Sequence, residues 1–278
     1  MSDLISPLST NLRLMAVATA ISFMILEYFI GRLTHHETHD WRESAASFGV
    51  ALGQNLVRAA EAVLVAIPFT VVYRHRLLDF DQTSAAAILS LFLATEFFYY
   101  WQHRASHRIR WMWATHAVHH SATKLNFTAA IRLGWTGNIS GNFLFFLPLI
   151  LIGFHPFAVV GMLSVNLLYQ FFVHTELVST LGPLEWVLNT PAHHRVHHAS
   201  NDACLDKNYG GVLILFDRLF GSFAKAPESE PLRYGLVGGV PSYNPFRIAL
   251  DEWRKLFRDV ARASSMSRRF KTLFGPPG

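Results

Sequence analysis

The sequence has little charge and almost no cysteine. Only 15% of its 278 residues are charged, against about 25% in a typical soluble domain. In contrast, 51% of the residues are hydrophobic, and Phe alone occurs 23 times. Cys204 is the single cysteine, which excludes a disulfide framework and a cysteine-based metal site. This composition predicts a membrane protein.

Several cofactor and targeting motifs are also absent from the sequence. It contains no GxGxxG dinucleotide motif, no CxxCH haem motif, no HExxH zinc motif and no ferredoxin cysteine pattern. Any redox chemistry would therefore need electrons from a separate partner or a small reductant. The first apolar run ends in Gly31-Arg32 without a small-residue cleavage site, which predicts a retained anchor rather than a signal peptide.

Long apolar stretches predict about five membrane helices. One crossing needs about 20 residues, and the last stretch is too long for one crossing. Gly153 to Pro156 interrupts it and predicts a tight hairpin of two helices. The sequence thus predicts an all-α integral membrane helical bundle with a cytosolic helical His-rich cap, as a single domain over 1–278. The four stretches are Leu14–Ile30, Phe48–Tyr73, Ser84–Trp101 and Ile139–His174.

The distribution of cations predicts which side of the membrane the polar segments occupy. Residues 102–135 carry five Lys or Arg and no acid, and the positive-inside rule places such a segment in the cytoplasm. The predicted hairpin returns the chain to the same side, so every histidine group shares that compartment. Arg74 and Arg76 conflict with this topology, and the side of the N-terminus stays open.

The C-terminal part of the chain is strongly basic. Residues 247–271 hold eight Lys or Arg and three acids, which accounts for the net charge of +5. On a helix, the apolar residues of the tail 246–271 share one face. This pattern predicts a basic amphipathic helix on the membrane surface, with anionic lipids rather than nucleic acid as partner. The alternative is a helix packed on the protein body. The residues of this face are Leu250, Trp253, Leu256, Phe257 and Val260.

Ten of the 15 histidines fall into four groups with regular spacing. One group reads HxxxH and two contain HxxHH, so the imidazoles of each group share one helix face. A tetrahedral ion takes four ligands and an octahedral ion six, so this number predicts two metal ions. A further cluster, His35, His36 and His39, is predicted to be a solvated loop. The ten candidate ligands are His103, His107, His116, His119, His120, His174, His193, His194, His197 and His198.

Three polar residues are candidates for catalytic or supporting roles. Glu96 lies seven residues before His103, on the same helical face. An ionisable group within a membrane helix is costly and usually functional, so Glu96 is predicted to accept the N–H of a ligating imidazole. A structural ion pair is the alternative. Asp206 and Asn208 follow the last histidine group and are the other two candidates.

These motifs together resemble the fatty acid hydroxylase/sterol desaturase superfamily, and most closely its bacterial sterol-desaturase-like group that includes alkylglycerol monooxygenases. The segments after the last box, Leu205 to Gly211 and Phe216 to Gly221, and the closing Leu273 to Gly278, strengthen the resemblance. The boxes that carry it are His103-Arg104-Ala105-Ser106-His107, His116-Ala117-Val118-His119-His120-Ser121, His174-Thr175-Glu176-Leu177 and His194-Arg195-Val196-His197-His198.

The resemblance implies an oxygenase that uses two iron ions, O₂ and two external electrons to hydroxylate or desaturate a lipid. It makes nine of the histidines iron ligands, while His193 precedes the box register by one residue. It also implies a bacterial inner membrane location, with the site facing the cytoplasm. The electron donor would be a ferredoxin- or cytochrome-type protein or a small reductant.

Two other functions remain open from the residues alone. A membrane zinc hydrolase would need about three protein ligands and a Glu base. A non-enzymatic metal transporter or haem-binding membrane protein would place its ligands within the spans.

Overall fold

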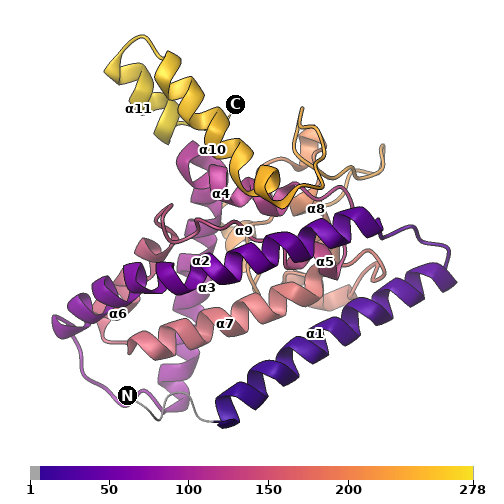
Figure 1. Cartoon of the computed structure of the whole chain (residues 1–278). Coiled ribbons are helices and arrows are strands. Elements are labelled where there is room, and N and C mark those ends of the chain that lie inside the picture. The colour runs from indigo at the N-terminus through magenta and orange to yellow at the C-terminus, as the bar shows by residue number, and fades with distance from the viewer. Residues whose placement is uncertain (1–6, 278) are drawn as a thin grey trace.

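The computed structural model describes residues 7–277, with side chains from Leu14 onward. The described residues form helices joined by loops and no strand, with two isolated bridges (Figure 1). The prediction of an all-α fold is therefore confirmed. Residues 1–6 and 278 of the predicted domain lie outside the described residues.

Three helices are long and apolar enough to cross a membrane. They are α1 (Pro7–Leu33), α2 (Trp41–Arg74) and α7 (Pro156–Val173). Within the described part of the chain this number is lower than the predicted five. Asp40 begins α2 by accepting the N–H groups of Arg42 and Glu43, which adds two turns before the predicted start. These helices support an integral membrane protein.

The other predicted membrane spans do not form long helices that are apolar over their whole length. The helix α3 (Ala85–Arg108) continues past Trp101, as predicted, but its second half is rich in polar residues. The first arm of the predicted hairpin consists of η2 (Asn142–Phe146) and α6 (Leu147–Ile152). At about 1.5 Å per residue, this arm reaches only about half of a hydrocarbon core of about 30 Å.

The predicted turn between α6 and α7 is present. Gly153 has a φ of 137°, and a Cβ there would lie 2.3 Å from the carbonyl oxygen of Leu78. Only glycine fits this turn. The apolar core beside it joins α2, α3, α6 and α7, and its buried side chains are Phe69, Leu91, Tyr99, Phe146, Leu149, Ile150, Phe154 and Val159.

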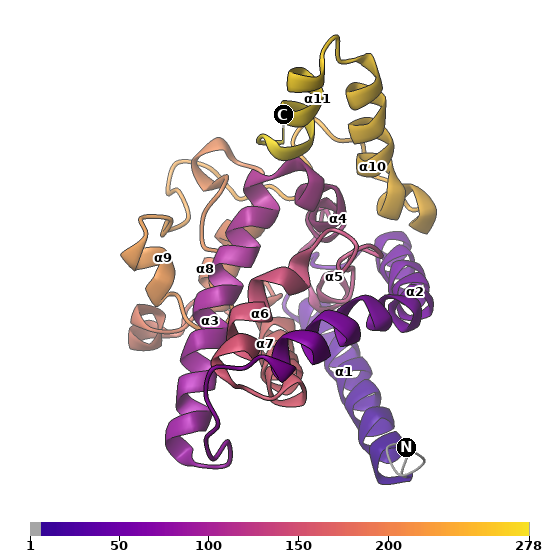
Figure 2. The ribbon, with the colours of Figure 1, turned by 90° about the vertical axis from the view of Figure 1, so that its left-hand side faces the viewer.

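Short helices extend the upper end of α3 and form the cap. Figure 2 shows α3 upright, with α4 (Arg110–His120) at its upper end and α8 (Pro191–His198) beside it. Pro191 occupies the first turn of α8, as predicted, because its ring fixes a helical φ where no N–H is needed. The other short helices are α5 (Phe127–Ala130), η3 (Gly182–Trp186), η4 (Asp202–Cys204) and α9 (Leu215–Leu219).

The basic tail packs on the protein body. It forms α10 (Pro245–Arg262) and α11 (Met266–Phe274), a hairpin at the end of the molecule opposite the N-terminal helix (Figure 1). Trp253 and Leu256 are buried against Ala114 and Trp111 of α4. These two residues of the predicted apolar face cover α4, as in the alternative prediction, whereas Leu250 and Phe257 of the same face are exposed.

Candidate metal centre

The predicted histidine groups meet in two clusters next to one another. Within each cluster, every residue offers a nitrogen that lies within 4.8 Å of the others. The two clusters contain nine of the ten candidate histidines. The first, the five-histidine cluster, is His103, His107, His116, His120 and His197, and the second, the four-histidine cluster, is His119, His174, His194 and His198.

Each HxxHH box contributes to both clusters. In α4, the i,i+4 pair His116 and His120 joins the five-histidine cluster, while His119 joins the other. In α8 the roles are exchanged, because the i,i+4 pair His194 and His198 joins the four-histidine cluster. The stacked rings of His120 and His198, with centroids 4.4 Å apart, form the boundary between the clusters. The boxes thus build two adjacent sites.

Backbone carbonyls orient several of the rings. The Nδ1 atom of His103 lies 2.8 Å from the Tyr209 oxygen, and that of His174 lies 2.6 Å from the Gln170 oxygen. A carbonyl only accepts, so Nδ1 carries the proton and Nε2 keeps its free lone pair. His119 and His197 are held in the same way by the carbonyls of Arg132 and Lys207.

Several buried nitrogens at the centre have no hydrogen-bond partner among the described residues. They are the Nε2 atoms of His107, His197 and His198 and the Nδ1 atom of His194. A buried polar atom without a partner is costly, and a metal ion would satisfy it. The donor set, which is entirely imidazole, suits iron, copper, nickel or zinc. The residues present therefore fit a metal pair.

The imidazoles are held in the neutral form that binds metal. Burial lowers the pKa of His174 and His197 to about 4. For His103, His119 and the other five, burial first and neighbouring imidazoles second lower the pKa well below its usual range. No proton needs to leave these rings before a metal ion binds at neutral pH.

His193 belongs to neither cluster, and its prediction as a ligand was wrong. Its Nδ1 lies 3.2 Å from the Leu188 oxygen and faces the N–H of Thr190. Its ring packs edge-on against Phe223. Because it is one residue before the HxxHH register, it lies on another face of α8, where it caps the helix start.

Glu96 is buried near the centre but holds a loop rather than an imidazole. One carboxylate oxygen accepts the N–H groups of Val212 and Leu213, both at 2.8 Å, and the other accepts the amide of Asn166 at 2.5 Å. Among the described residues, Glu96 therefore does not accept the predicted hydrogen bond from a ligating imidazole. The role of Glu96 is indirect, because the loop that it holds follows Tyr209, whose carbonyl orients His103.

The other two polar candidates differ in their distance from the clusters. An Asp206 oxygen lies 3.8 Å from Nδ1 of His107, and its second oxygen accepts Arg108 at 2.7 Å. Asn208 donates to the carbonyls of His193 and Ala224 and contacts no ligand ring in the described residues. Asp206 thus adjoins the site, whereas Asn208 fixes the backbone around α8.

The sequence reasoning missed a buried ion pair that supports His119. The Arg132 guanidinium is fully buried and lies 3.5 Å from Glu43. It also donates to Ser47 and Ser121. Charged residues are few in this chain, so Glu43 and Arg132 were visible as candidates. Their pairing could not be predicted, because they are 89 positions apart in the sequence. This pair holds the Arg132 carbonyl toward the His119 ring.

Asp217 was also missed as a supporting residue. Its oxygens accept the N–H groups of Tyr209 and Gly210 at 2.8 and 2.7 Å and the hydroxyl of Ser222 at 2.7 Å. Together with Glu96, it clamps the loop 209–213 from both ends. The two carboxylates therefore fix the position of the Tyr209 carbonyl.

Two cavities of different character reach the clusters. One, of about 270 Å³, is lined by His103, His116, His119 and His174 on one side. Its other side consists mainly of apolar residues: Ala130, Leu133, Phe146, Leu163, Leu167 and Phe171. The second, of about 560 Å³, reaches His107, His120, His197 and His198 and is lined by charged residues that include Arg108, Arg110 and Asp206.

The region of the chain that carries the clusters matches a known protein family. Residues 88–222 match the family model of fatty acid hydroxylase. The chain is 38% identical to the alkylglycerol monooxygenase of Xenopus tropicalis over 204 residues, which covers 73% of this chain and 45% of the relative. The human alkylglycerol monooxygenase is 39% identical over 205 residues, with the same shares.

A bacterial relative is also similar. The ornithine lipid hydroxylase OlsE of Rhizobium tropici is 30% identical over 153 residues, which covers 55% of this chain and 46% of the relative. The chain thus spans about half the length of the curated relatives that it matches. No solved structure matches.

Proposed function

Because this chain belongs to the fatty acid hydroxylase family, we propose that it is a membrane lipid hydroxylase whose two histidine clusters each hold an iron ion. The single observation that carries the proposal is the arrangement of nine imidazoles, eight of them buried and that of His116 half-buried, in two adjacent clusters. Backbone carbonyls hold the Nδ1 atoms of four of these rings, those of His103, His119, His174 and His197.

The proposed iron ions would supply the activation of O₂ that allows an unreactive C–H bond to be oxidised. The residues of the chain do the rest. The apolar cavity ends at the rings of His103, His116, His119 and His174, so an alkyl chain in it would present a carbon to both clusters. Leu163, Leu167 and Phe171 would hold that chain and exclude water.

The relatives support a lipid substrate and favour hydroxylation over desaturation. Their names describe an alkylglycerol monooxygenase and an ornithine lipid hydroxylase, and both substrates combine a polar head with long apolar chains. An apolar cavity beside membrane-spanning helices suits such a molecule. We therefore propose an oxygen-insertion reaction on the chain of a membrane lipid.

The polar cavity is the proposed route for the remaining reactants. Charged residues line part of its wall, and it reaches four of the clustered rings that the apolar cavity does not reach. Electrons would enter there from a separate donor, because the sequence carries no flavin, haem or iron–sulfur motif. The excess of cations over residues 102–135 supports a cytoplasmic orientation.

A zinc hydrolase is less compatible with this geometry. Catalytic zinc sites use three protein ligands and leave one position for water, whereas the clusters have five and four imidazoles. The described ligand groups also contain no carboxylate that would serve as a general base.

Mass analysis of membrane lipids tests the proposal. Cells that make the protein and cells that make its His119→Ala variant would be grown under isotopically labelled O₂, and their lipid extracts compared. Hydroxylation predicts a lipid that gains one labelled oxygen atom only with the wild-type protein. A lipid that loses two hydrogens would indicate desaturation, and identical extracts would contradict an oxygenase.

A further inference from the structure

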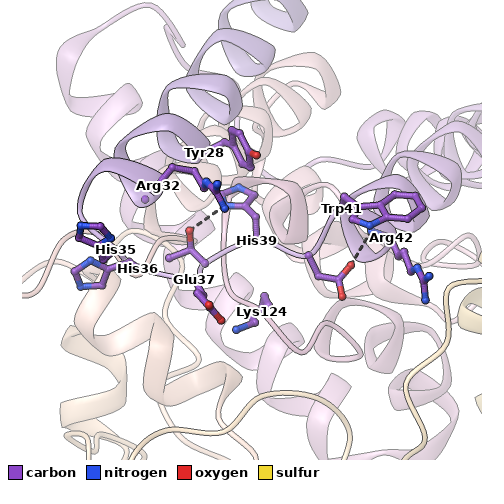
Figure 3. Close-up of a pocket in the computed structure, with 12 residues that line it drawn as sticks. Tyr28, Arg32, His35, His36, Glu37, His39, Trp41, Arg42 and Lys124 are labelled. Atoms are coloured by element: carbon purple, nitrogen blue, oxygen red, sulfur yellow. Dashed lines mark hydrogen bonds between the residues drawn. The ribbon is translucent and has the colours of Figure 1, made fainter.

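A large polar pocket lies apart from the metal clusters, where α1 ends and α2 begins. Its volume is about 860 Å³, and it is lined by the loop between the two helices together with Tyr28, Arg32 and Lys124 (Figure 3). Both helices are long and apolar enough to cross a membrane. The pocket therefore lies at the level where a membrane helix leaves the hydrocarbon core.

Three cations from separate segments line the pocket, with Arg42 beside Trp41 on the far side from Arg32 (Figure 3). Arg32 comes from the last turn of α1, Arg42 from the first turn of α2, and Lys124 from the loop after α4 (Figure 3). None of their side chains has a carboxylate partner among residues 14–277. Cations that line one pocket without a carboxylate partner suggest an anionic ligand.

The two carboxylates of the pocket offset the charge of these cations only in part. The Asp40 carboxylate accepts the N–H groups of Arg42 and Glu43 and so serves as the cap of α2. Glu37 lines the pocket but forms no ion pair within the described chain. The balance is three positive charges against two negative ones, so the pocket keeps one net positive charge.

The loop that forms the pocket is held in place. The Asn126 amide donates to the Thr38 carbonyl at 2.6 Å, and the Thr38 hydroxyl contacts Nδ1 of His39 at 2.9 Å. A Cβ on Gly31 would lie 2.8 Å from the Thr38 hydroxyl, so the loop packs directly on α1. The pocket is thus formed before any ligand binds.

Aromatic residues at the pocket suit the membrane interface. Tyr28 and Trp41 both line it, and Trp41 is 75% exposed. The Arg42 guanidinium lies 5.4 Å from the Trp41 ring centroid. Tyr and Trp concentrate at the headgroup level of a bilayer, where Lys and Arg attract anionic lipids.

We propose that this pocket binds the phosphate of an anionic phospholipid headgroup. Arg32 and Lys124 would donate to the phosphate oxygens, because guanidinium and ammonium groups form charge-assisted bonds with phosphate. Arg42, at the other end of the pocket, would add to its positive charge. Tyr28 and Trp41 would contact the glycerol region. A metal ion is not the expected ligand, because His35 and His36 are exposed and neither joins a ligand group in the described residues.

Lipid binding to the purified protein tests this site. The protein in detergent would be titrated with phosphatidylglycerol and, separately, with phosphatidylcholine, and retained lipid counted by native mass spectrometry. The variant is Arg32→Gln with Lys124→Gln. The matched control is Arg254→Gln with Arg258→Gln, two exposed cations of α10. Metal content and helix content would confirm that each variant is folded.

We expect the wild type and the control to bind phosphatidylglycerol tightly. The affinity of the pocket variant for this lipid should be at least tenfold lower. Glycerol phosphate serves as the soluble probe. If it binds equally well and is lost in the same variant, the site recognises phosphate rather than a membrane lipid. Equal retention by the pocket variant and the control, or equal binding of phosphatidylcholine, would overturn the proposal. None of these outcomes depends on oxygenase activity.

Discussion

The Nε2 atoms of His119 and His174 lie 3.0 Å apart, although the two residues are 55 positions apart in the sequence. Two nitrogens that bind one ion at about 2.0–2.1 Å would be about 3 Å from each other. His194 lies 2.9 Å from His174 in the same manner. The end of α7, the last turn of α4 and the middle of α8 therefore converge at ligand-binding distance.

The first prediction concerns the ligands. His119→Ala removes one of four imidazoles from its cluster, so the protein should lose about one metal equivalent and fall at least 100-fold in activity. Helix content and membrane insertion should persist, because the long apolar helices carry the insertion. His193→Ala is the matched control and should keep both metals. Metal analysis of both variants decides the assignment, and full metal content in His119→Ala would refute it.

A second prediction concerns the loop held by Glu96. In Glu96→Gln one oxygen acceptor becomes an N–H donor that faces the Asn166 amide. A buried mismatch of this kind costs about 1–3 kcal/mol, so the unfolding temperature should fall. Displacement of the Tyr209 carbonyl should also speed the loss of metal during dialysis against a chelator. An unchanged unfolding temperature and rate of loss would show that Glu96 does not position the site.

The third prediction uses two glycines. A Cβ at Gly211 would lie 2.1 Å from the Asn166 amide nitrogen, so Gly211→Ala should push Asn166 away from Glu96 and lower both stability and metal retention. Gly161 lies in α7 and has nothing within 4 Å. Gly161→Ala should therefore keep or raise the unfolding temperature, since alanine favours helix by about 1 kcal/mol. Equal effects of the two substitutions would contradict this packing.

A fourth prediction concerns the Glu43–Arg132 pair. Glu43→Ala leaves the buried Arg132 without its carboxylate, and removal of one partner of a buried pair costs about 3–5 kcal/mol. The exposed pair Glu230–Arg233 offers the control, because a surface pair contributes only about 0–1 kcal/mol. Thermal unfolding should separate Glu43→Ala from Glu230→Ala by many degrees. Similar unfolding temperatures would argue that Glu43 is not needed to hold Arg132.

The fifth prediction addresses the apolar cavity. Leu163 lines the cavity of about 270 Å³, and Leu163→Trp should fill much of it. Long-chain lipid turnover should fall at least tenfold while metal content stays constant, because Leu163 is not a ligand. Leu168→Trp, on the exposed side of the same helix, is the control and should keep its activity. Equal activity of the two variants would mean that substrate reaches the clusters by another route.

The sequence predicted which histidines would meet better than how they would be grouped. The i,i+3 and i,i+4 spacings placed the imidazoles on common helix faces, and all nine clustered histidines were among the ten candidates. They did not predict that His119 leaves its neighbours His116 and His120 for the other cluster. That partition depends on how α4 and α8 cross, which is a tertiary feature.

Other parts of the structure depend on contacts that leave no pattern in the sequence. The rings of His103 and His174 are oriented by backbone carbonyls, and every residue has one. Glu96 was correctly singled out as a buried acid, but its partners, Asn166 and two backbone N–H groups, lie 70 or more residues away. Likewise, the amphipathic face of α10 predicted burial without showing whether protein or membrane covers it.

Mössbauer spectroscopy of protein loaded with isotope-enriched iron tests the central claim most directly. One cluster has five imidazoles and the other four, so two iron sites of equal population and unequal parameters should be present in each chain. A single type of iron, one iron per chain, or a protein that binds no iron under reducing conditions would contradict the account.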